Sequence, residues 1–365
     1  MRWKKGSPDY VLILTILLLL SVGIVMVFSA SAYSAMLEKG DRFHYLKRQV
    51  LWTLVGLPVM AFVMNVDYFR VKRFAGLFLV FSLVLLLLVP FMGIAKYGAT
   101  RSLGFGAVTF QPSELVKPIV VMFMAKSLSD NQAYLHQLFK GLAPQLAVLA
   151  IVAGLIMAQP DLGTTVAVAG TSFVMFIAAG VRLAHLLPLG LVGLGGAALL
   201  VVSEEYRMRR ILAFLAPEKD PTGAGFQIIQ SLIALGSGGV FGMGLGEGRQ
   251  KLLYIPERHT DFIFAIIGEE LGFIGITVVI ILFAILVWRG FRIAINAPDV
   301  YGSLLAVGLT TMVALQAVIN MGVVSGSLPI TGITLPLISY GGSSLLFTLV
   351  GLGMLLNISC YGAQR

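Results

Sequence analysis

The stretch FIFAIIGEELGFIGITVVIILFAILVW, residues 262–288, is apolar except for Glu269, Glu270 and Thr277. A helix of this length crosses the roughly 30 Å of hydrocarbon in a bilayer. The rest of the chain has the same character, with 58% hydrophobic and only 12% charged residues, against about 25% charged in soluble domains. The sequence therefore predicts an all-α integral membrane protein with several spans.

Nine further apolar segments are long enough to be considered as spans. They cover residues 10–32, 47–66, 75–93, 112–128, 142–158, 163–181, 183–202, 301–324 and 342–360. Ten spans place both termini on one side of the membrane. The first span follows a basic N-terminus and has no small-residue cleavage site, so we expect a retained signal anchor with cytoplasmic termini. The positive-inside rule agrees at several loops but not at the basic residues of 203–260.

Charge and metal-ligand patterns exclude several classes of function. The net charge of +9 is scattered over loops, which is not the clustered footprint of a nucleic-acid-binding protein. It suits anionic headgroups or a phosphate-bearing lipid. The single cysteine, Cys360, permits no intramolecular disulfide or thiolate cluster. The four histidines lack ligand spacing, which argues against a zinc site.

Whether the long insertion 203–260 crosses the membrane decides which side of the membrane its C-terminal end faces. It begins with a basic run and becomes apolar and glycine-rich from residue 226 to 245. Glutamines and glycines make a poor lipid-facing helix, and irregular backbone at membrane depth is tolerated where it lines a protein cavity. We therefore expect a large extracellular loop that partly re-enters the membrane. Segment 327–344, which contains two prolines, should fold back against the bundle beside it.

Asp261 lies where this insertion meets the apolar stretch 262–288. A carboxylate at the edge of a membrane-buried segment is costly to keep and marks a functional site by default. An alternative is a cap, because Thr260 or Asp261 suits a helix N-terminus. Further along, Glu269 and Glu270 are too deep in the helix for capping. At least one of them should face the bundle interior and find a partner there.

Glu114 and Lys117 form a second candidate pair. They are three residues apart in QPSELVKP, residues 111–118, and so share one helix face. They could be a structural ion pair, a contact for the substrate, or both. Asp161 lies at a tight link between two spans, where it could cap the following helix or act in function.

Outward-facing arginines supply possible phosphate clamps. Guanidinium groups bind phosphate oxygens in a bidentate manner, although loop arginines are often simply solvated. On the assumed topology the candidates are Arg48, Arg101, Arg207, Arg209 and Arg210.

Taken together, several motifs in a fixed order resemble the shape, elongation, division and sporulation (SEDS) family of FtsW, RodA and SpoVE. The resemblance covers essentially the whole chain. It is carried by FSASA 28–32, KRQ 47–49, QPSE 111–114 with KP 117–118, QPDLG 159–163, GFQ 225–227 with QS 230–231, PERHTDF 256–262, GEELG 268–272, NMG 320–322, TGITLP 331–336 and SYGGSS 339–344. The form of residues 259–262 is closer to the FtsW and SpoVE branch. One departure is Arg101-Ser102, where the family usually has Arg-Trp, which puts an aromatic contact there in doubt.

The resemblance implies a ten-helix glycosyltransferase of the bacterial cytoplasmic membrane. Such an enzyme polymerises lipid II, an undecaprenyl-pyrophosphate-linked disaccharide peptide, into glycan strands on the outer face. It works with a class B penicillin-binding transpeptidase. The resemblance also implies that Asp261 is the catalytic residue and that Glu114 and Lys117 are paired. Division, elongation and sporulation all stay open as pathways.

The chemistry of that reaction is consistent with these residue types. Inversion at an anomeric carbon needs a general base on the acceptor hydroxyl, and one carboxylate suffices. The departing diphosphate needs only positive charge, from side chains or from a divalent cation such as Mg²⁺ or Mn²⁺. Backbone donors at the helix start near Ser343 could hold a phosphate, or that segment could be a plain turn and cap. The expected substrate-binding residues are Arg48, Arg101, Gln111, Lys117, Arg209, Arg210 and Ser343, and further candidates are Asp161, Glu257, His259 and Glu269.

Two other functions use the same features. A lipid II flippase would need a similar bundle and a cationic cavity, although no inverted repeat of the kind common in transporters is visible. A non-catalytic scaffold for a transpeptidase is the third possibility.

Overall fold

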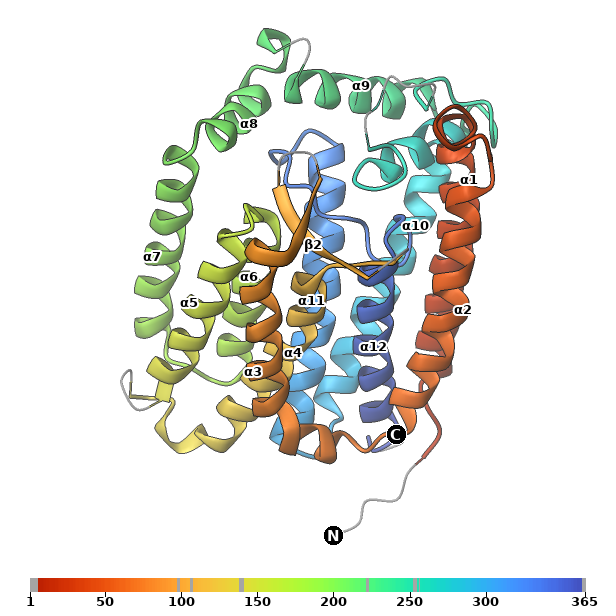
Figure 1. Ribbon diagram of the computed structural model, residues 1–365. Coiled ribbons are helices and arrows are strands. Elements are labelled where there is room, and N and C mark those ends of the chain that lie inside the picture. The colour runs from red at the N-terminus through yellow and green to blue at the C-terminus, as the bar shows by residue number, and fades with distance from the viewer. Residues whose placement is uncertain are drawn as a thin grey trace.

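The computed structural model describes residues 6–96, 99–105, 108–137, 141–220, 223–251, 255 and 257–362. Most of these residues form helices that run side by side in one bundle (Figure 1). The α-helices are α1 Tyr10–Lys39, α2 His44–Asn65, α3 Tyr68–Met92, α4 Pro112–Asp130, α5 Ala143–Met157, α6 Leu162–Ala178, α7 Leu183–Val202, α8 Glu205–Leu215, α9 Ala224–Ser237, α10 Ile263–Ile295, α11 Val300–Val324 and α12 Gly342–Ser359. The described residues also form the short 3-10 helices η1 Gln132–Tyr134 and η3 Pro217–Lys219.

All ten predicted apolar segments fall on helices. Within the described residues, 7 helices are long and apolar enough to cross a membrane: α1, α2, α3, α7, α10, α11 and α12. Of the other three, α5 and α6 have 15 and 17 residues, and α4 carries four charged side chains within its 19 residues. The chain is therefore a multi-pass membrane protein.

Both ends of the described chain lie at the same end of the bundle (Figure 1). The Gly6 N–H donates to the Cys360 carbonyl at 2.7 Å, and the Arg289 Nε donates to the Asp9 carboxylate at 2.8 Å. These contacts tie the N-terminal segment to α10 and α12. An even number of membrane crossings agrees with this arrangement.

The core of the bundle is centred on α11, where most side chains are buried. Helix α12 packs against α2, and α3 packs against α4. By contrast, α7 stands at the edge of the bundle (Figure 1) and buries only Leu186. Its exposed leucines and valines suit contact with lipid, because lipid tails are as apolar as these side chains.

A small antiparallel sheet that the sequence did not predict connects α3 to α4. It consists of β1 Gly93–Lys96, β2 Ala99–Phe105 and β3 Val108–Phe110, in the order β1-β2-β3. In the register, Leu103 pairs with Gly93 on one side and with Phe110 on the other. Strands this short carry too little alternation to be recognised in an apolar sequence. The sheet carries Arg101, which lies in β2.

The expectation of an irregular loop over residues 226–245 is wrong for its first half. Helix α9 covers Ala224–Ser237 and lies with α8 across the end of the bundle (Figure 1). The helix is stable because one face is anchored: Ile228 and Ala234 are buried, and the Ser231 hydroxyl donates to the Val324 carbonyl at 2.7 Å. Irregular backbone with positive φ at several glycines begins only after Gly238.

Helix α10 is broken at Gly272, whereas the sequence predicted one continuous helix over 262–288. Gly272 has φ 66° and ψ −163°, a conformation that is open essentially to glycine alone. The glycine-rich loop that follows α9 packs into this break. The Phe273 N–H donates to the Gly239 carbonyl at 2.9 Å, and the Met243 N–H donates to the Glu269 carbonyl at 2.9 Å. A Cβ atom at position 272 would lie 2.3 Å from the Gly242 nitrogen. The part of α10 before Gly272 is thus a buried half-helix, which the break separates from the rest of α10.

The predicted placement of segment 327–344 is confirmed in the structure. Its residues between α11 and α12 form no helix. The Tyr340 N–H donates to the His259 carbonyl at 2.9 Å, and Arg210 of α8 donates to the Ile330 carbonyl at 3.1 Å. The segment therefore lies against both the insertion and the peptide that precedes α10.

Substituting Gly272→Ala should destabilise the protein by roughly 1–3 kcal/mol, because the left-handed backbone and the close Gly242 contact both exclude a Cβ. Gly154→Ala in α5 is the control, since nothing lies within 4 Å of its added Cβ, and a helical Gly-to-Ala change should gain up to about 1 kcal/mol. Thermal unfolding in detergent measures both. Equal stability of the two variants would contradict the break as a required feature.

Candidate functional site

A cavity of about 1280 Å³ lies between the sheet, α8 and the ends of the bundle helices. Its wall combines charged groups from many parts of the chain with a similar number of apolar side chains. The charged lining residues in the described structure are Arg48, Arg101, Lys117, Arg207, Arg210, Glu114, Asp161, Glu204, Glu257 and Asp261. Ligand pockets of drug-sized molecules measure about 300–1,000 Å³, so this cavity has room for a larger molecule.

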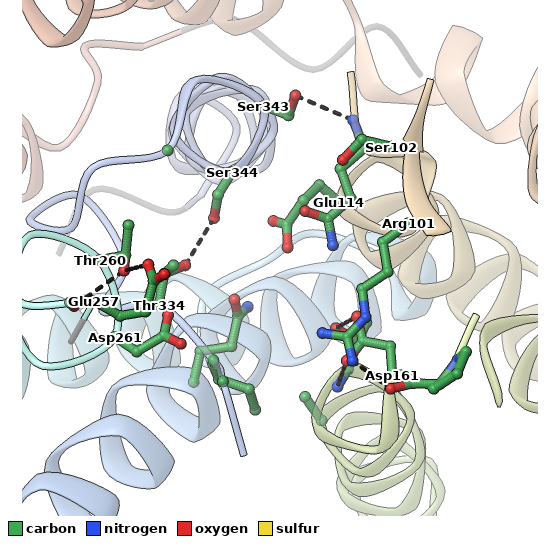
Figure 2. A pocket seen from close by; sticks show the side chains of 18 of the residues that line it. Arg101, Ser102, Glu114, Asp161, Glu257, Thr260, Asp261, Thr334, Ser343 and Ser344 are labelled. Atoms are coloured by element: carbon green, nitrogen blue, oxygen red, sulfur yellow. Dashed lines mark hydrogen bonds between the residues drawn. The ribbon is translucent and has the colours of Figure 1, made fainter. Parts of the chain in front are cut away.

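Asp261 lies on one side of this cavity, beside Glu257 and Thr260, with Arg101 and Asp161 on the other side in Figure 2. Helix α10 begins at Ile263, and its N-cap is Phe262, which makes no side-chain capping bond. The alternative of a helix cap at Thr260 or Asp261 is therefore wrong. Within the described part of the chain, no hydrogen bond or ion pair reaches the Asp261 carboxylate, although the Asn320 side chain binds its backbone carbonyl at 2.7 Å.

The surroundings of Asp261 change its acidity. Burial, followed by the negative charge of Glu257, raises the pKa of Asp261 to about 7, and the charges of Arg210 and Arg101 act against this rise. Glu257 itself accepts a hydrogen bond from the Thr260 hydroxyl at 2.7 Å. A carboxylate with a pKa near neutrality is a stronger base than an ordinary aspartate and is still ionised in a large fraction of molecules at pH 7.

Two arginines face Asp261 without a carboxylate partner of their own. Arg101 donates from Nε to the Gln159 carbonyl at 3.1 Å and also to the Pro160 carbonyl. Arg210 donates to the Ile330 carbonyl at 3.1 Å. Neither belongs to an ion pair among the described residues. Backbone carbonyls fix these guanidinium groups without neutralising them, which leaves positive charge for an anion.

Helix geometry decides which arginines of α8 reach the cavity. Arg207 and Arg210 are three residues apart and share a face, and both line the cavity. Arg209, a predicted substrate-binding residue, does not line it and instead forms an exposed ion pair with Glu205 at 2.6 Å. Arg207 was a candidate phosphate clamp from the basic run, but it was not among the expected substrate-binding residues.

The predicted pair of Glu114 and Lys117 is confirmed. Their charged atoms are 2.8 Å apart, and the two residues are only 8% and 5% exposed. Lys117 also donates to the Gln316 side chain at 2.7 Å, and all three residues line the cavity. Gln316 was missed by the sequence analysis, where the signal was a lone glutamine inside apolar α11.

The other predicted residues around the cavity have clear local roles. Gln111 is the N-cap of α4, and its N–H donates to the Ser343 hydroxyl at 3.3 Å, which joins the start of α4 to the start of α12. Asp161 accepts from the Thr164 N–H at 3.1 Å, so the predicted cap of α6 is confirmed. Arg48 also lines the cavity, at the start of α2. The structure therefore brings together Arg48, Arg101, Gln111, Glu114, Lys117, Asp161, Arg210, Glu257, Asp261 and Ser343.

His259 and Glu269 do not line the cavity. The His259 ring packs against Tyr45 and Tyr340, with centroids 4.4 and 5.6 Å away. Glu269 accepts from the Arg249 N–H at 2.7 Å and supports the glycine-rich loop.

The expectation that at least one of the two glutamates in α10 has an interior partner is confirmed. Glu270 forms an ion pair with Lys251 at 2.7 Å and accepts a hydrogen bond from the Ser29 hydroxyl of α1. With Glu269 held by backbone N–H groups, both carboxylates stabilise the packing of the insertion on the bundle.

The described carboxylates do not form a metal cage. No group of three or more His, Cys, Asp or Glu side chains within the described ranges is arranged to hold a metal ion. A Mg²⁺ ion commonly takes only one or two protein carboxylates and completes its shell with water and substrate phosphates.

Comparison with known proteins extends over the entire bundle. The FtsW, RodA and SpoVE family model, described as cell cycle protein, matches residues 10–364. The chain is 50% identical over 363 residues to stage V sporulation protein E of Bacillus subtilis (strain 168), covering 99% of each chain. It is 47% identical over 361 residues to a probable peptidoglycan glycosyltransferase FtsW of Geobacter sp. (strain M18), covering 98% of each.

Solved structures give the same result. A chain from a structure described as "structural coordination of polymerization and crosslinking by a peptidoglycan synthase complex" superposes with a TM-score of 0.80 at 33% identity, covering 98% of this chain and 99% of that one. The rod shape determining protein RodA of Thermus thermophilus superposes with a TM-score of 0.73 at 30% identity, covering 98% of each chain.

The acidity of Asp261 can be measured directly. Infrared titration of the protonated carboxyl band, assigned by its loss in Asp261→Asn, should give a midpoint near pH 7. In Glu257→Gln the midpoint should move to lower pH, because a neighbouring negative charge that disfavours ionisation is removed. A midpoint near that of an ordinary aspartate, or one unchanged by Glu257→Gln, would contradict the electrostatics described here.

Proposed function

The chain belongs to the FtsW, RodA and SpoVE family, and from this premise we propose that it is a peptidoglycan glycosyltransferase that polymerises lipid II, with Asp261 as the general base. Its relatives named as probable peptidoglycan glycosyltransferases match it over nearly their full length. One observation supports this role of Asp261. Its carboxylate faces a large cavity, opposite arginines that no described carboxylate neutralises.

The proposed reaction needs one proton transfer. The acceptor sugar hydroxyl attacks the anomeric carbon of the growing strand, and its proton passes to the Asp261 carboxylate. The bond from that carbon to the diphosphate oxygen breaks, and the electron pair leaves with the lipid diphosphate. Attack and departure on opposite faces of the sugar ring invert the anomeric carbon.

The departing diphosphate is an anion that requires positive charge and no general acid. Arg101 and Arg210 support this role, because their carbonyl anchors orient the guanidinium groups while their charge stays available. Arg48 and Ser343 lie on the wall of the same cavity and are proposed to contact the sugar or phosphate of a second lipid-linked substrate. Arg209 is outside the cavity and is not part of the proposed site.

Lys117 is proposed to have a structural and a substrate-binding role together. An ammonium group has three donors; Glu114 and Gln316 take two of them. The third can serve a phosphate oxygen at the cavity wall. The buried Glu114 fixes the position of the ammonium group and offsets the cost of its burial.

The proposed membrane arrangement has ten spans, with α4, α5 and α6 crossing in addition to the seven longer apolar helices. Both termini are cytoplasmic, and the cavity and insertion 203–260 face outward in the bacterial cytoplasmic membrane. The chain's proposed partner is a class B penicillin-binding transpeptidase, a proposal supported by its likeness to a chain of a peptidoglycan synthase complex. A Mg²⁺ or Mn²⁺ ion held by substrate phosphates and one carboxylate is compatible with the cavity, and the steps above do not use it.

Asp261→Asn should lower the rate of glycan polymerisation from purified lipid II by about 10²–10⁴-fold, because the amide cannot accept the proton. Glu218→Gln is the control, since Glu218 is an exposed carboxylate of the same insertion outside the cavity. Product is measured as glycan strand length on gels. Unchanged polymerisation by Asp261→Asn would reject Asp261 as the base. Absence of product with the unaltered protein would favour a scaffold, or a flippase where lipid II moves between leaflets.

Cysteine labelling tests the proposed orientation in a Cys360→Ser background. Glu218→Cys, in the insertion, should react with an impermeant maleimide added to intact cells. Arg182→Cys, which is exposed in the link between α6 and α7, should react only after the membrane is opened. The reverse pattern would overturn the outward orientation of the cavity.

A further inference from the structure

The peptide that carries Asp261 is held at three consecutive carbonyl groups. The carbonyl of His259 accepts from the Tyr340 N–H at 2.9 Å. The carbonyl of Thr260 accepts from the Ser339 hydroxyl at 2.6 Å, and that of Asp261 accepts from the Asn320 side chain at 2.7 Å. All three donors lie between residues 320 and 340, far along the chain from the peptide they bind.

Asn320 connects this peptide to a second loop. Its amide nitrogen also donates to the Ile333 carbonyl at 2.8 Å, so one side chain on α11 binds two irregular segments at once. The residue is only 1% exposed. Burying an amide is costly unless it is hydrogen-bonded, and here both N–H donors of the amide are used on the loops that meet at Asp261.

Ser339 acts on the same junction in a similar way. Its hydroxyl donates to Thr260 and accepts from the Leu335 N–H at 2.8 Å. Ser339 therefore stabilises its own loop through the bond from Leu335, and it also fixes the peptide before α10. Asn320 and Ser339 approach this peptide through separate bonds to neighbouring carbonyls, which allows their effects to be tested independently.

These bonds matter because the Asp261 carboxylate has no hydrogen bond from the described residues that would fix it directly. Its position in the cavity is set by the backbone that carries it. A general base must lie within hydrogen-bond reach of the proton that it removes, and an error of about 1 Å in a reacting group can cost on the order of 10²-fold in rate.

We propose that Asn320 is a positioning residue for the reaction, which acts through the backbone carbonyl of Asp261, and that Ser339 supports it through the carbonyl of Thr260. The inference rests on the proposed role of Asp261 as the base. Neither side chain lines the cavity, so neither is expected to contact the substrate.

Loss of the hydrogen bond from Asn320 should change the pKa of Asp261, whereas a general loss of stability should not. The charged groups that act on Asp261 are Glu257 of its own loop, Arg210 of α8, Arg101 of β2 and Asp161 before α6. Freeing the Asp261 carbonyl lets the carboxylate move toward water, and weaker burial lowers its pKa toward that of an ordinary aspartate. The acidic limb of the kcat profile should then move to lower pH.

Asn357 offers a matched control at the opposite end of the bundle. It is also 1% exposed, donates to the Met64 carbonyl at 2.6 Å and accepts from the Tyr68 N–H at 3.1 Å. Asn320→Ala and Asn357→Ala therefore each remove a buried asparagine that joins two segments. Only the first removes a bond to the peptide of Asp261.

The experiment measures polymerisation of purified lipid II across pH, together with thermal unfolding of each variant. Both alanine variants should lose stability, but only Asn320→Ala should lower kcat, by about 10- to 100-fold, with KM within about twofold of the unaltered protein. Its acidic limb should lie at lower pH. Ser339→Ala should show the same changes to a smaller degree, and Ser339→Thr, which keeps the hydroxyl, should restore activity.

An Asn320→Ala variant with kcat and pH profile like those of Asn357→Ala would overturn the inference. If Asn320→Ala does not fold, the kcat values and pH profiles of Ser339→Ala and Ser339→Thr test the inference instead. Should Asp261→Asn retain polymerisation, the proposed base itself fails. Loss of activity in Asp261→Asn with normal kcat in both Asn320→Ala and Ser339→Ala would reject only the positioning role.

Discussion

The structure depends on holding one unpaired carboxylate at the wall of a cavity in a bundle made mostly of apolar helices. Ionised groups in such surroundings are expensive and normally find a partner. The peptide around Asp261 is fixed instead at its backbone, through bonds from α11 and from the segment before α12. The carboxylate is thereby left available, and its raised pKa follows from the same arrangement.

Charges elsewhere in the bundle show the contrast. Glu114 is paired with Lys117, Glu270 with Lys251, and Asp9 with Arg289. Each of these pairs joins or orients helices, and removing one partner would leave a costly unpaired charge. The arginines that face Asp261 are held by carbonyl groups instead. The fold thus separates charges that stabilise it from charges that stay available to a substrate.

The sequence predicted the membrane class and the positions of the ten apolar helices well, because long apolar segments leave few alternatives. It also predicted the Glu114–Lys117 pair, since three-residue spacing on a helix fixes a shared face. It could not predict the break at Gly272, because one glycine in an apolar helix is usually tolerated and the cause is a loop about 30 residues earlier that packs there. The sheet between α3 and α4 was missed for a similar reason, as its short strands are stabilised by tertiary contacts.

Within the site, the sequence identified residues but not their roles. Asp261 suited both a cap and a base, and only the start of α10 at Ile263 decided against the cap. Arg209 and Arg210 looked equivalent until the orientation of α8 placed one in solvent and one at the cavity. Asn320 lay in a recognised motif, yet its proposed positioning role depends on bonds to carbonyls that are distant in sequence.

The proposed reaction depends on proton transfer from the incoming hydroxyl to Asp261. Its most direct test is the pH dependence of single-turnover polymerisation, compared between the unaltered protein and Glu257→Gln. The rate should fall as pH drops through about 7, because protonated Asp261 cannot act as a base, and the midpoint should lie at lower pH in Glu257→Gln. A rate that is independent of pH in this range, or a midpoint that Glu257→Gln leaves in place, would contradict it.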